Sequence, residues 1–170
     1  MQPAFTVWCT GLPSSGKEAL ARMISELCTS RGQETTLFLS PALRAGGPSD
    51  ATVQRDIQTS QSHMADGRIS VVSAESPRTT QRNNARQTLT RFIEVYVATP
   101  KESCIDGDDS GYWKKALNGE LRNFPGVDHP YEVPTRPDIS VDLSIISIDE
   151  AMVHCASAFE KMGLLQPIAQ

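Results

Sequence analysis

Short apolar segments alternate along the chain with longer segments whose apolar residues recur at helical spacing. Segments rich in β-branched and aromatic residues are typical of strands, and they lie at 4–10, 35–39, 69–72, 92–97 and 139–143. The pattern predicts a helix after the first strand, closed by Arg31 and Gly32, and further helices at 50–65, 79–90, 111–118 and 148–162. The stretch 124–137 carries four prolines, so we expect an ordered loop or lid there.

This alternation predicts an α/β fold with a mostly parallel central sheet and right-handed crossovers. The first apolar segment is apolar along nearly its whole length, which is typical of a central strand covered on both faces. A chain of 170 residues fits one domain with its own core. We therefore expect a single domain over residues 1–170, with a lid at about 111–137.

Composition narrows the classes of partner. The chain has 16 Lys and Arg residues against 20 Asp and Glu residues, and this net charge of −4 argues against a nucleic-acid or anionic-lipid partner. No apolar run approaches the length of a membrane span, and residues 1–10 lack the order of a secretory signal, so we expect a cytoplasmic protein without a membrane partner.

Metal-ligating patterns are absent from the sequence. The cysteines and histidines show no metal-ligand spacing, so no metal site is predicted and the cysteines are expected to be buried free thiols: Cys9, Cys28, Cys104 and Cys155. An acidic cluster could hold a cation but fits a solvated turn better: Asp106, Asp108 and Asp109. One helical side carries arginines that could meet an anion, although an exposed charged face is favoured: Arg78, Arg82, Arg86 and Arg91.

The segment 11–17 matches the phosphate-binding pattern G-x-x-x-x-G-K between a predicted strand and a predicted helix. Its backbone N–H groups and lysine are suited to nucleotide phosphates, and the predicted nucleotide site comprises these residues and the one that follows them: Gly11, Ser14, Ser15, Gly16, Lys17 and Glu18. The next residue is Glu18, where the full pattern has a Ser or Thr that ligates Mg²⁺. We expect Glu18 to impair metal-assisted transfer while some nucleotide affinity remains; its other reading is a carboxylate that complements the helix dipole.

Further along, the chain resembles the adenylylsulfate kinase family. The resemblance is carried by V-x-V-x-T-P at 95–100, by Cys104, and by the run at 111–116 and 119–132, which is similar to G-L-Y-K-K-A-R-x-G-E-I-K-G-F-T-G-I-D-x-P-Y-E. Upstream, residues 76–78 and 82–86 resemble the family's I-S-P-[YF]-R segment and the arginine-rich helix after it.

The resemblance implies a three-layer α/β/α phosphate-loop fold and transfer of the ATP γ-phosphoryl group to the 3′-hydroxyl of adenylyl sulfate, with Mg²⁺ accompanying ATP. It implies partners of ATP or ADP and adenylyl sulfate or its 3′-phosphorylated product, and a homodimer or association with a sulfate-activating enzyme. By resemblance Lys17 is the catalytic cation. Substrate-side roles carry over to Arg44 for the sulfate ester, to Ser76 and Pro77 for the pocket wall, to Lys115, and to Phe124 for stacking on the substrate adenine.

The chain departs from the family at positions that bear on chemistry. The pattern D-G-D-N is replaced at 39–42, so that Pro41 stands where a carboxylate is expected. The motif D-R-x-x-N has no counterpart between Gly46 and Ile57, with Ser49 and Thr52 the nearest alignment, and the R-D pair after Cys104 is replaced at 107–108.

Three functions remain open on the sequence. The leading one is a nucleotide-binding domain of sulfate activation with weak or lost kinase activity and a regulatory or partner role. The alternative is an active adenylylsulfate kinase in which Glu18 or the acidic cluster supplies the missing metal ligand. The weakest is a structural interaction module that binds no nucleotide.

Overall fold

A five-stranded parallel sheet forms the centre of the molecule in the computed structural model, which describes residues 3–40 and 46–167. The strands are β1 (Thr6–Thr10), β2 (Thr35–Leu39), β3 (Ile69–Ser73), β4 (Phe92–Val97) and β5 (Ile139–Val141). Their order in the sheet is β2-β3-β1-β4-β5, and each neighbouring pair is parallel. The strand β1 is therefore central, and the carboxyl ends of all five strands open onto the same edge of the sheet.

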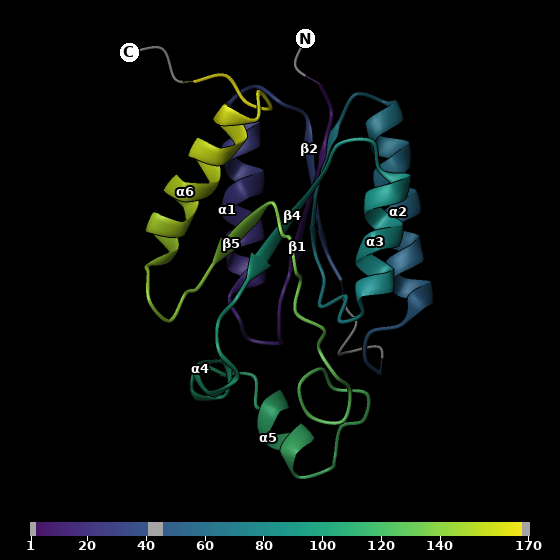
Figure 1. Cartoon of the computed structure of the whole chain (residues 1–170), viewed down its shortest axis with the longest axis vertical. Coiled ribbons are helices and arrows are strands. Elements are labelled where there is room, and N and C mark those ends of the chain that lie inside the picture. Colours follow the sequence, from purple (N-terminus) through teal and green to yellow (C-terminus); the bar gives the residue numbers. More distant parts are fainter. Residues whose placement is uncertain (1–2, 41–45, 168–170) are drawn as a thin grey trace.

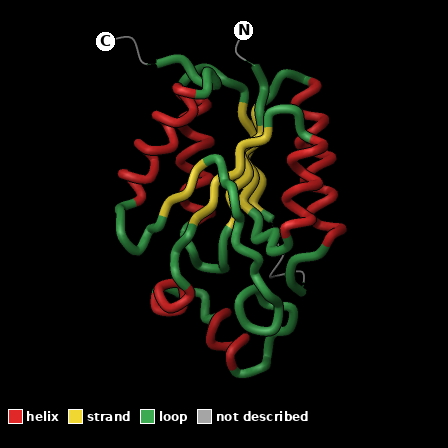
Figure 2. The backbone as a smooth tube through the Cα atoms, in the orientation of Figure 1, coloured by secondary structure: helices red, strands yellow, loops and turns green. Residues whose placement is uncertain are grey.

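Two layers of helices cover the sheet (Figure 1). The helices α1 (Lys17–Ser30) and α6 (Ile148–Lys161) lie on one face, and α2 (Asp50–Ala65) and α3 (Thr79–Thr88) lie on the other. Two short helices, α4 (Lys101–Asp106) and α5 (Tyr112–Leu117), lie beyond the carboxyl ends of the strands (Figure 2). The segment 118–138 that follows them, here called the long loop, connects α5 to β5. This arrangement confirms the predicted three-layer α/β/α fold.

The core is divided by the sheet. Every residue of β1 is buried, with Val7 and Cys9 packing toward α1 and α6, and Trp8 packing toward α2 and α3. Because β1 is covered on both faces, its three central positions are all apolar, as the pattern of a central parallel strand requires. A third, smaller cluster around Trp113 and Phe124 holds α4, α5 and the loop together below the sheet.

The predicted elements are confirmed, with bounds that differ by a few residues at some ends. The helix predicted at 50–65 was weakly patterned, yet it begins at a capping box in which Ser49 and Thr52 bond each other's backbone N–H. The helix α4 was missed because its six residues are too few to show helical periodicity. The single domain over 1–170 stays a prediction.

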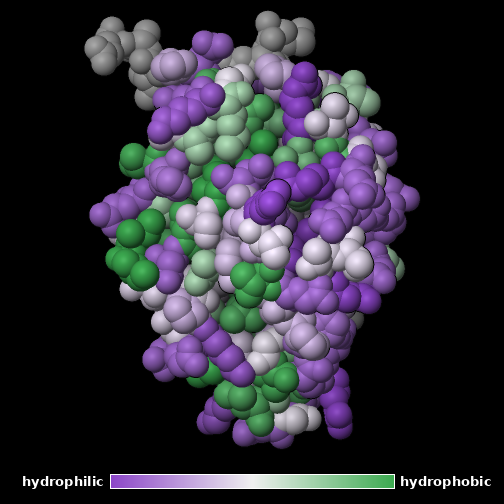
Figure 3. Space-filling model, viewed as in Figure 1, coloured by the Kyte–Doolittle hydropathy of each residue, from purple (hydrophilic) through white to green (hydrophobic). Residues whose placement is uncertain are grey.

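The surface carries mostly polar side chains, with apolar residues scattered among them (Figure 3). The most exposed large apolar side chains are Ile145 and Val153, in and just before α6. Within the described ranges 3–40 and 46–167, no helix is long and apolar enough to span a bilayer.

Candidate nucleotide-binding site

The phosphate loop joins β1 to α1 at the carboxyl edge of the sheet. Its backbone needs glycine at two points: Gly16 has a φ of 93°, and a Cβ on Gly11 would lie 2.6 Å from the carbonyl oxygen of Val97. Gly16 accepts the first hydrogen bond of α1, from the N–H of Leu20 at 3.0 Å. The free N–H groups and the positive end of α1 therefore face the loop, which is the geometry that binds phosphate.

Lys17 is almost buried, with 7% of its surface exposed. Its Nζ lies 3.1 Å from Oε1 of Glu75 and donates a hydrogen bond to the carbonyl of Leu12 at 3.1 Å. The ammonium is thus held inside the loop by the loop's own backbone and by one carboxylate. In this position it is available to the outer phosphates of a nucleotide.

The two serines of the loop have different environments. Ser15 is buried, its hydroxyl has no hydrogen-bond partner among the described residues, and its carbonyl accepts a bond from Thr99 at 2.7 Å. Ser14, with a φ of 61°, donates to Oδ1 of Asp108 at 3.1 Å. These bonds join the phosphate loop to the segments that follow β4.

Glu18 lies on the outer surface of α1. Its side chain is 60% exposed and pairs with Arg22 one turn along the helix, at 3.0 Å. The carboxylate therefore does not lie over the phosphate loop in this structure. This position agrees with the reading of Glu18 as a residue that supports the first turn of the helix.

Ser76 and Pro77 form a buried wall beside the phosphate loop, directly after β3. The Ser76 hydroxyl accepts a hydrogen bond from the indole N–H of Trp8 at 3.0 Å and donates to Oγ1 of Thr10 at 3.2 Å. The carbonyl of Pro77 accepts from the N–H of Glu132 at 2.8 Å. The structure thus brings these two predicted substrate-side residues to the same edge as the phosphate loop.

The long loop is fastened to this wall by Arg82, which is 2% exposed. Its guanidinium pairs with Glu94 at 3.3 Å, donates to the carbonyls of Ser76 and Glu132, and lies over the ring of Tyr131. The exposed charged face that the sequence favoured for this helix is therefore wrong for Arg82, because its side chain reaches inward to a carboxylate on β4. Helical spacing alone cannot show such a partner.

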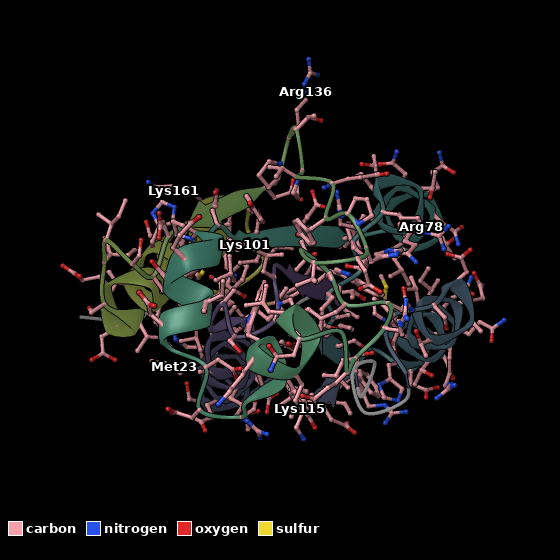
Figure 4. All side chains as sticks on the ribbon, turned by 90° about the horizontal axis from the view of Figure 1, so that it is seen from below. Met23, Arg78, Lys101, Lys115, Arg136 and Lys161 are labelled. Atoms are coloured by element: carbon pink, nitrogen blue, oxygen red, sulfur yellow. The ribbon has the colours of Figure 1, made fainter. Side chains whose placement is uncertain are left out.

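Phe124 belongs to the small cluster beyond the carboxyl ends of the strands, against which Leu12 of the phosphate loop packs, and Lys115 lies on α5. The Phe124 ring is 1% exposed and packs edge-on against Trp113 at 4.9 Å, while Lys115 is exposed on α5 (Figure 4). Trp113 donates its indole N–H to the carbonyl of Pro13 in the phosphate loop at 3.0 Å. Substrate contacts of Phe124 and Lys115 stay predictions.

Two residues that bear on the site lie outside the described residues. These are Arg44, predicted to bind the sulfate ester, and Pro41, which replaces the family's carboxylate.

The acidic cluster before α5 is a helix-capping turn. Asp108 accepts hydrogen bonds from the N–H of Trp113 at 2.8 Å and from the N–H of Ser110 at 3.1 Å. Desolvation alone would raise the pKa of Asp108, but the bonds from Ser110 and Trp113 outweigh it and lower that pKa. Over residues 3–40 and 46–167, no group of three or more His, Cys, Asp or Glu side chains could hold a metal ion by itself. The turn favoured by the sequence is what the structure shows.

Sequence reasoning missed Glu75. This residue follows β3, its side chain is 8% exposed, and its Oε2 has no hydrogen-bond partner among the described residues. A signal was present, since an acidic residue directly after a buried strand beside the phosphate-loop strand lies at the edge where ligands bind in parallel sheets.

Comparisons with known proteins agree with this geometry. The family model described as Adenylylsulphate kinase matches residues 3–142. An adenylyl-sulfate kinase of Clostridium acetobutylicum is 36% identical over 151 residues, which cover 83% of this chain and 76% of that protein. An adenylyl-sulfate kinase of Marinobacter nauticus is 35% identical over 171 residues, covering 94% and 86% of the two chains.

A solved structure is also similar. The Mycobacterium tuberculosis APS kinase CysC in complex with AMPPNP and APS has a TM-score of 0.82 to this chain at 29% identity, and the match covers 94% of this chain and 99% of that chain. With the family pattern, the curated relatives and the fold all in agreement, the chain belongs to the adenylylsulfate kinase family.

Proposed function

We propose that this protein is an adenylylsulfate kinase, which transfers the γ-phosphoryl group of ATP to the 3′-hydroxyl of adenylyl sulfate. The observation that carries the proposal is the buried Lys17 inside a phosphate loop of the pattern G-x-x-x-x-G-K, next to the Ser76–Pro77 wall. Phosphoryl transfer depends mainly on positioning and charge neutralisation, and this arrangement offers both. Relatives named as kinases also fit catalysis better than its loss.

The residues of the chain divide the work. The N–H groups of the loop and the positive end of α1 hold the β- and γ-phosphates, and Lys17 neutralises charge that develops on the transferred group. Ser76 and Pro77 border the space where the second nucleotide is expected, and Arg82 keeps that border rigid through buried bonds. Mg²⁺ bound with ATP supplies further neutralisation of the phosphates, and the unpartnered buried oxygen of Glu75 fits such an ion.

The second candidate is a nucleotide-binding domain with weak or lost kinase activity and a regulatory role. It is favoured by Glu18 in place of a metal-ligating hydroxyl and by Pro41 in place of a carboxylate. The loss of both groups would cost several powers of ten in rate if nothing replaced them.

Coupled detection of ADP separates the two candidates. Purified protein with ATP and Mg²⁺ should form ADP only when adenylyl sulfate is added, and Lys17→Ala should abolish that formation. Lys161→Ala is the matched control, since Lys161 is exposed at the carboxyl end of α6, which lies at the opposite end of the sheet from the phosphate loop (Figure 1). ATP binding without any ADP formed from adenylyl sulfate would instead support the second candidate.

Binding assays complete the test of partners. Titration calorimetry should show binding of ATP and of adenylyl sulfate, and the absence of both would leave only a structural module. Light scattering of the purified chain tests the expected homodimer directly.

A further inference from the structure

Glu75 lies at the carboxyl edge of the sheet, two residues beyond Ser73, the last position that β3 pairs with β1. Its carbonyl accepts a hydrogen bond from Oγ1 of Thr10, the last residue of β1, at 2.6 Å. This bond fixes the backbone of Glu75 beside the start of the phosphate loop. The side chain is 8% exposed and reaches Lys17 at 3.1 Å.

Only one of the two carboxylate oxygens of Glu75 has a partner among the described residues. Oε1 pairs with Lys17, whereas Oε2 is buried and has no hydrogen-bond partner among residues 3–40 and 46–167. Burying a charged oxygen without a partner costs free energy, so such an atom calls for a ligand that binds at this point. The phosphate loop lies beside this carboxylate, because Oε1 contacts Lys17 at 3.1 Å. The cation that accompanies nucleotide phosphates is Mg²⁺, which is held by one or two carboxylates together with the phosphates.

The position of Glu75 also complements a loss elsewhere. The family pattern I-S-P has isoleucine where this chain has Glu75, and the family's D-G-D-N carboxylate, after the second strand, is absent here. The strands β2, β3 and β1 are neighbours in that order. A carboxylate after β3 is therefore on the same sheet edge as one after β2, and one strand nearer the phosphate loop.

We propose that Glu75 is the carboxylate that holds the Mg²⁺ of bound ATP in this protein, in place of the family carboxylate after the second strand. In the absence of nucleotide, Glu75 balances the charge of Lys17. The proposal rests on the proposed function, since it assigns a ligand at the same phosphate site.

Titration calorimetry with the β,γ-imido analogue of ATP tests the proposal without catalysis. In the wild-type protein, Mg²⁺ should tighten binding relative to binding in excess EDTA. In Glu75→Gln, which keeps a hydrogen-bond acceptor for Lys17, the tightening by Mg²⁺ should fall by about tenfold or more, the scale on which lost metal contacts act. Affinity in EDTA should change much less.

Three further variants sharpen the comparison. Glu102→Gln makes the same charge change at an exposed position on α4 and should keep the full Mg²⁺ effect. Glu75→Ile installs the residue of the family pattern, so it gives a second variant without the carboxylate if Glu75→Gln fails to fold. Glu18→Gln tests the competing ligand and should retain the Mg²⁺ effect.

Three results would each overturn the proposal. The first is an undiminished Mg²⁺ effect in Glu75→Gln or Glu75→Ile, and the second is loss of that effect in Glu18→Gln. The third is a wild-type protein that binds the analogue equally well with and without Mg²⁺. Failure of the proposed function is distinguishable, because it appears as absent ADP formation with adenylyl sulfate while the Mg²⁺ effect on binding persists.

Discussion

Arg82→Met removes the side chain that joins three parts of the molecule. The guanidinium pairs with Glu94 on β4, donates to the carbonyl of Ser76 at 2.7 Å, and donates to the carbonyl of Glu132 in the long loop. Methionine has a similar length and no charge, so it fills the space but leaves the Glu94 carboxylate with Arg86, at 3.5 Å, as its one remaining cationic partner among the described residues.

The magnitude follows from burial. Arg82 and Glu94 have side chains that are 2% and 8% exposed, and removing one partner of such a buried pair costs about 3–5 kcal/mol. Because a chain of this size loses roughly 2–4 °C in Tm per kcal/mol, we expect a fall of about 6–20 °C. A total stability of about 5–15 kcal/mol exceeds a loss of about 3–5 kcal/mol over nearly all of its range, so we expect the variant to stay folded at low temperature.

The pH dependence has a definite sign. Burial raises the pKa of Glu94 above its ordinary 4.5, and Arg82 and Arg86 offset part of that rise. A carboxyl whose pKa is raised on folding binds its proton more tightly in the folded state, so its contribution to stability falls as the pH rises through the folded pKa. Without Arg82 the pKa rises further, and the destabilisation by Arg82→Met should be larger at neutral pH than near pH 4.5.

Urea unfolding followed by circular dichroism, at neutral and at acid pH, measures both effects. Arg86→Met is the matched control, because Arg86 lies one turn along α3, has a side chain 40% exposed and should cost about 1 kcal/mol or less. Glu94→Gln combined with Arg82→Met should recover part of the loss, since no buried charge is left unpaired. A destabilisation by Arg82→Met that equals that of the control, or that does not change with pH, would refute the reasoning.

Three more outcomes are expected. Gly16→Ala should abolish nucleotide binding in calorimetry, because φ is 93° and the new Cβ would lie 2.5 Å from Leu143; unchanged affinity would contradict this. Trp113→Phe keeps the apolar packing but loses the bond to the carbonyl of Pro13, so it should weaken ATP affinity severalfold while Tm falls by only a few degrees, about 1 kcal/mol in stability. The buried thiol of Cys28, whose pKa burial raises to about 12, should react with a thiol reagent only at the rate of unfolding, and rapid labelling of the folded protein would show that it is accessible.

The fold was predictable because its signals are local. The strand β2 and the helix α2 occupy the predicted residues, since a buried parallel strand and a capped helix are each specified within a few neighbouring side chains. The phosphate loop was equally predictable, because its glycines are required by the backbone conformation of the loop itself. The helix α4 was not predicted, because its six residues are too few to show helical periodicity and are held mainly by the packing of Cys104 within the third cluster.

The site was less predictable because its meaning depends on contacts between distant segments. Arg82 looked like one member of an exposed row, and only the fold shows that it faces Glu94. Glu75 was not predicted as a site residue, because its role depends on its contact with Lys17. The two residues belong to different segments of the chain, and only the fold brings Nζ of Lys17 within 3.1 Å of Oε1 of Glu75. Glu18, judged by its place in the motif, turns outward to Arg22.

These contacts change how the motif losses bear on function. A family pattern assigns each functional group to one position in the sequence. Catalysis requires only that a group of the right chemistry reach the right place in the folded protein. In a parallel sheet, the residues that follow neighbouring strands share one edge, so a carboxylate can be lost after β2 and supplied after β3 without leaving that edge. The replacement of D-G-D-N therefore does not by itself imply an inactive protein, and the carboxylate of Glu75 is the group on which activity should depend.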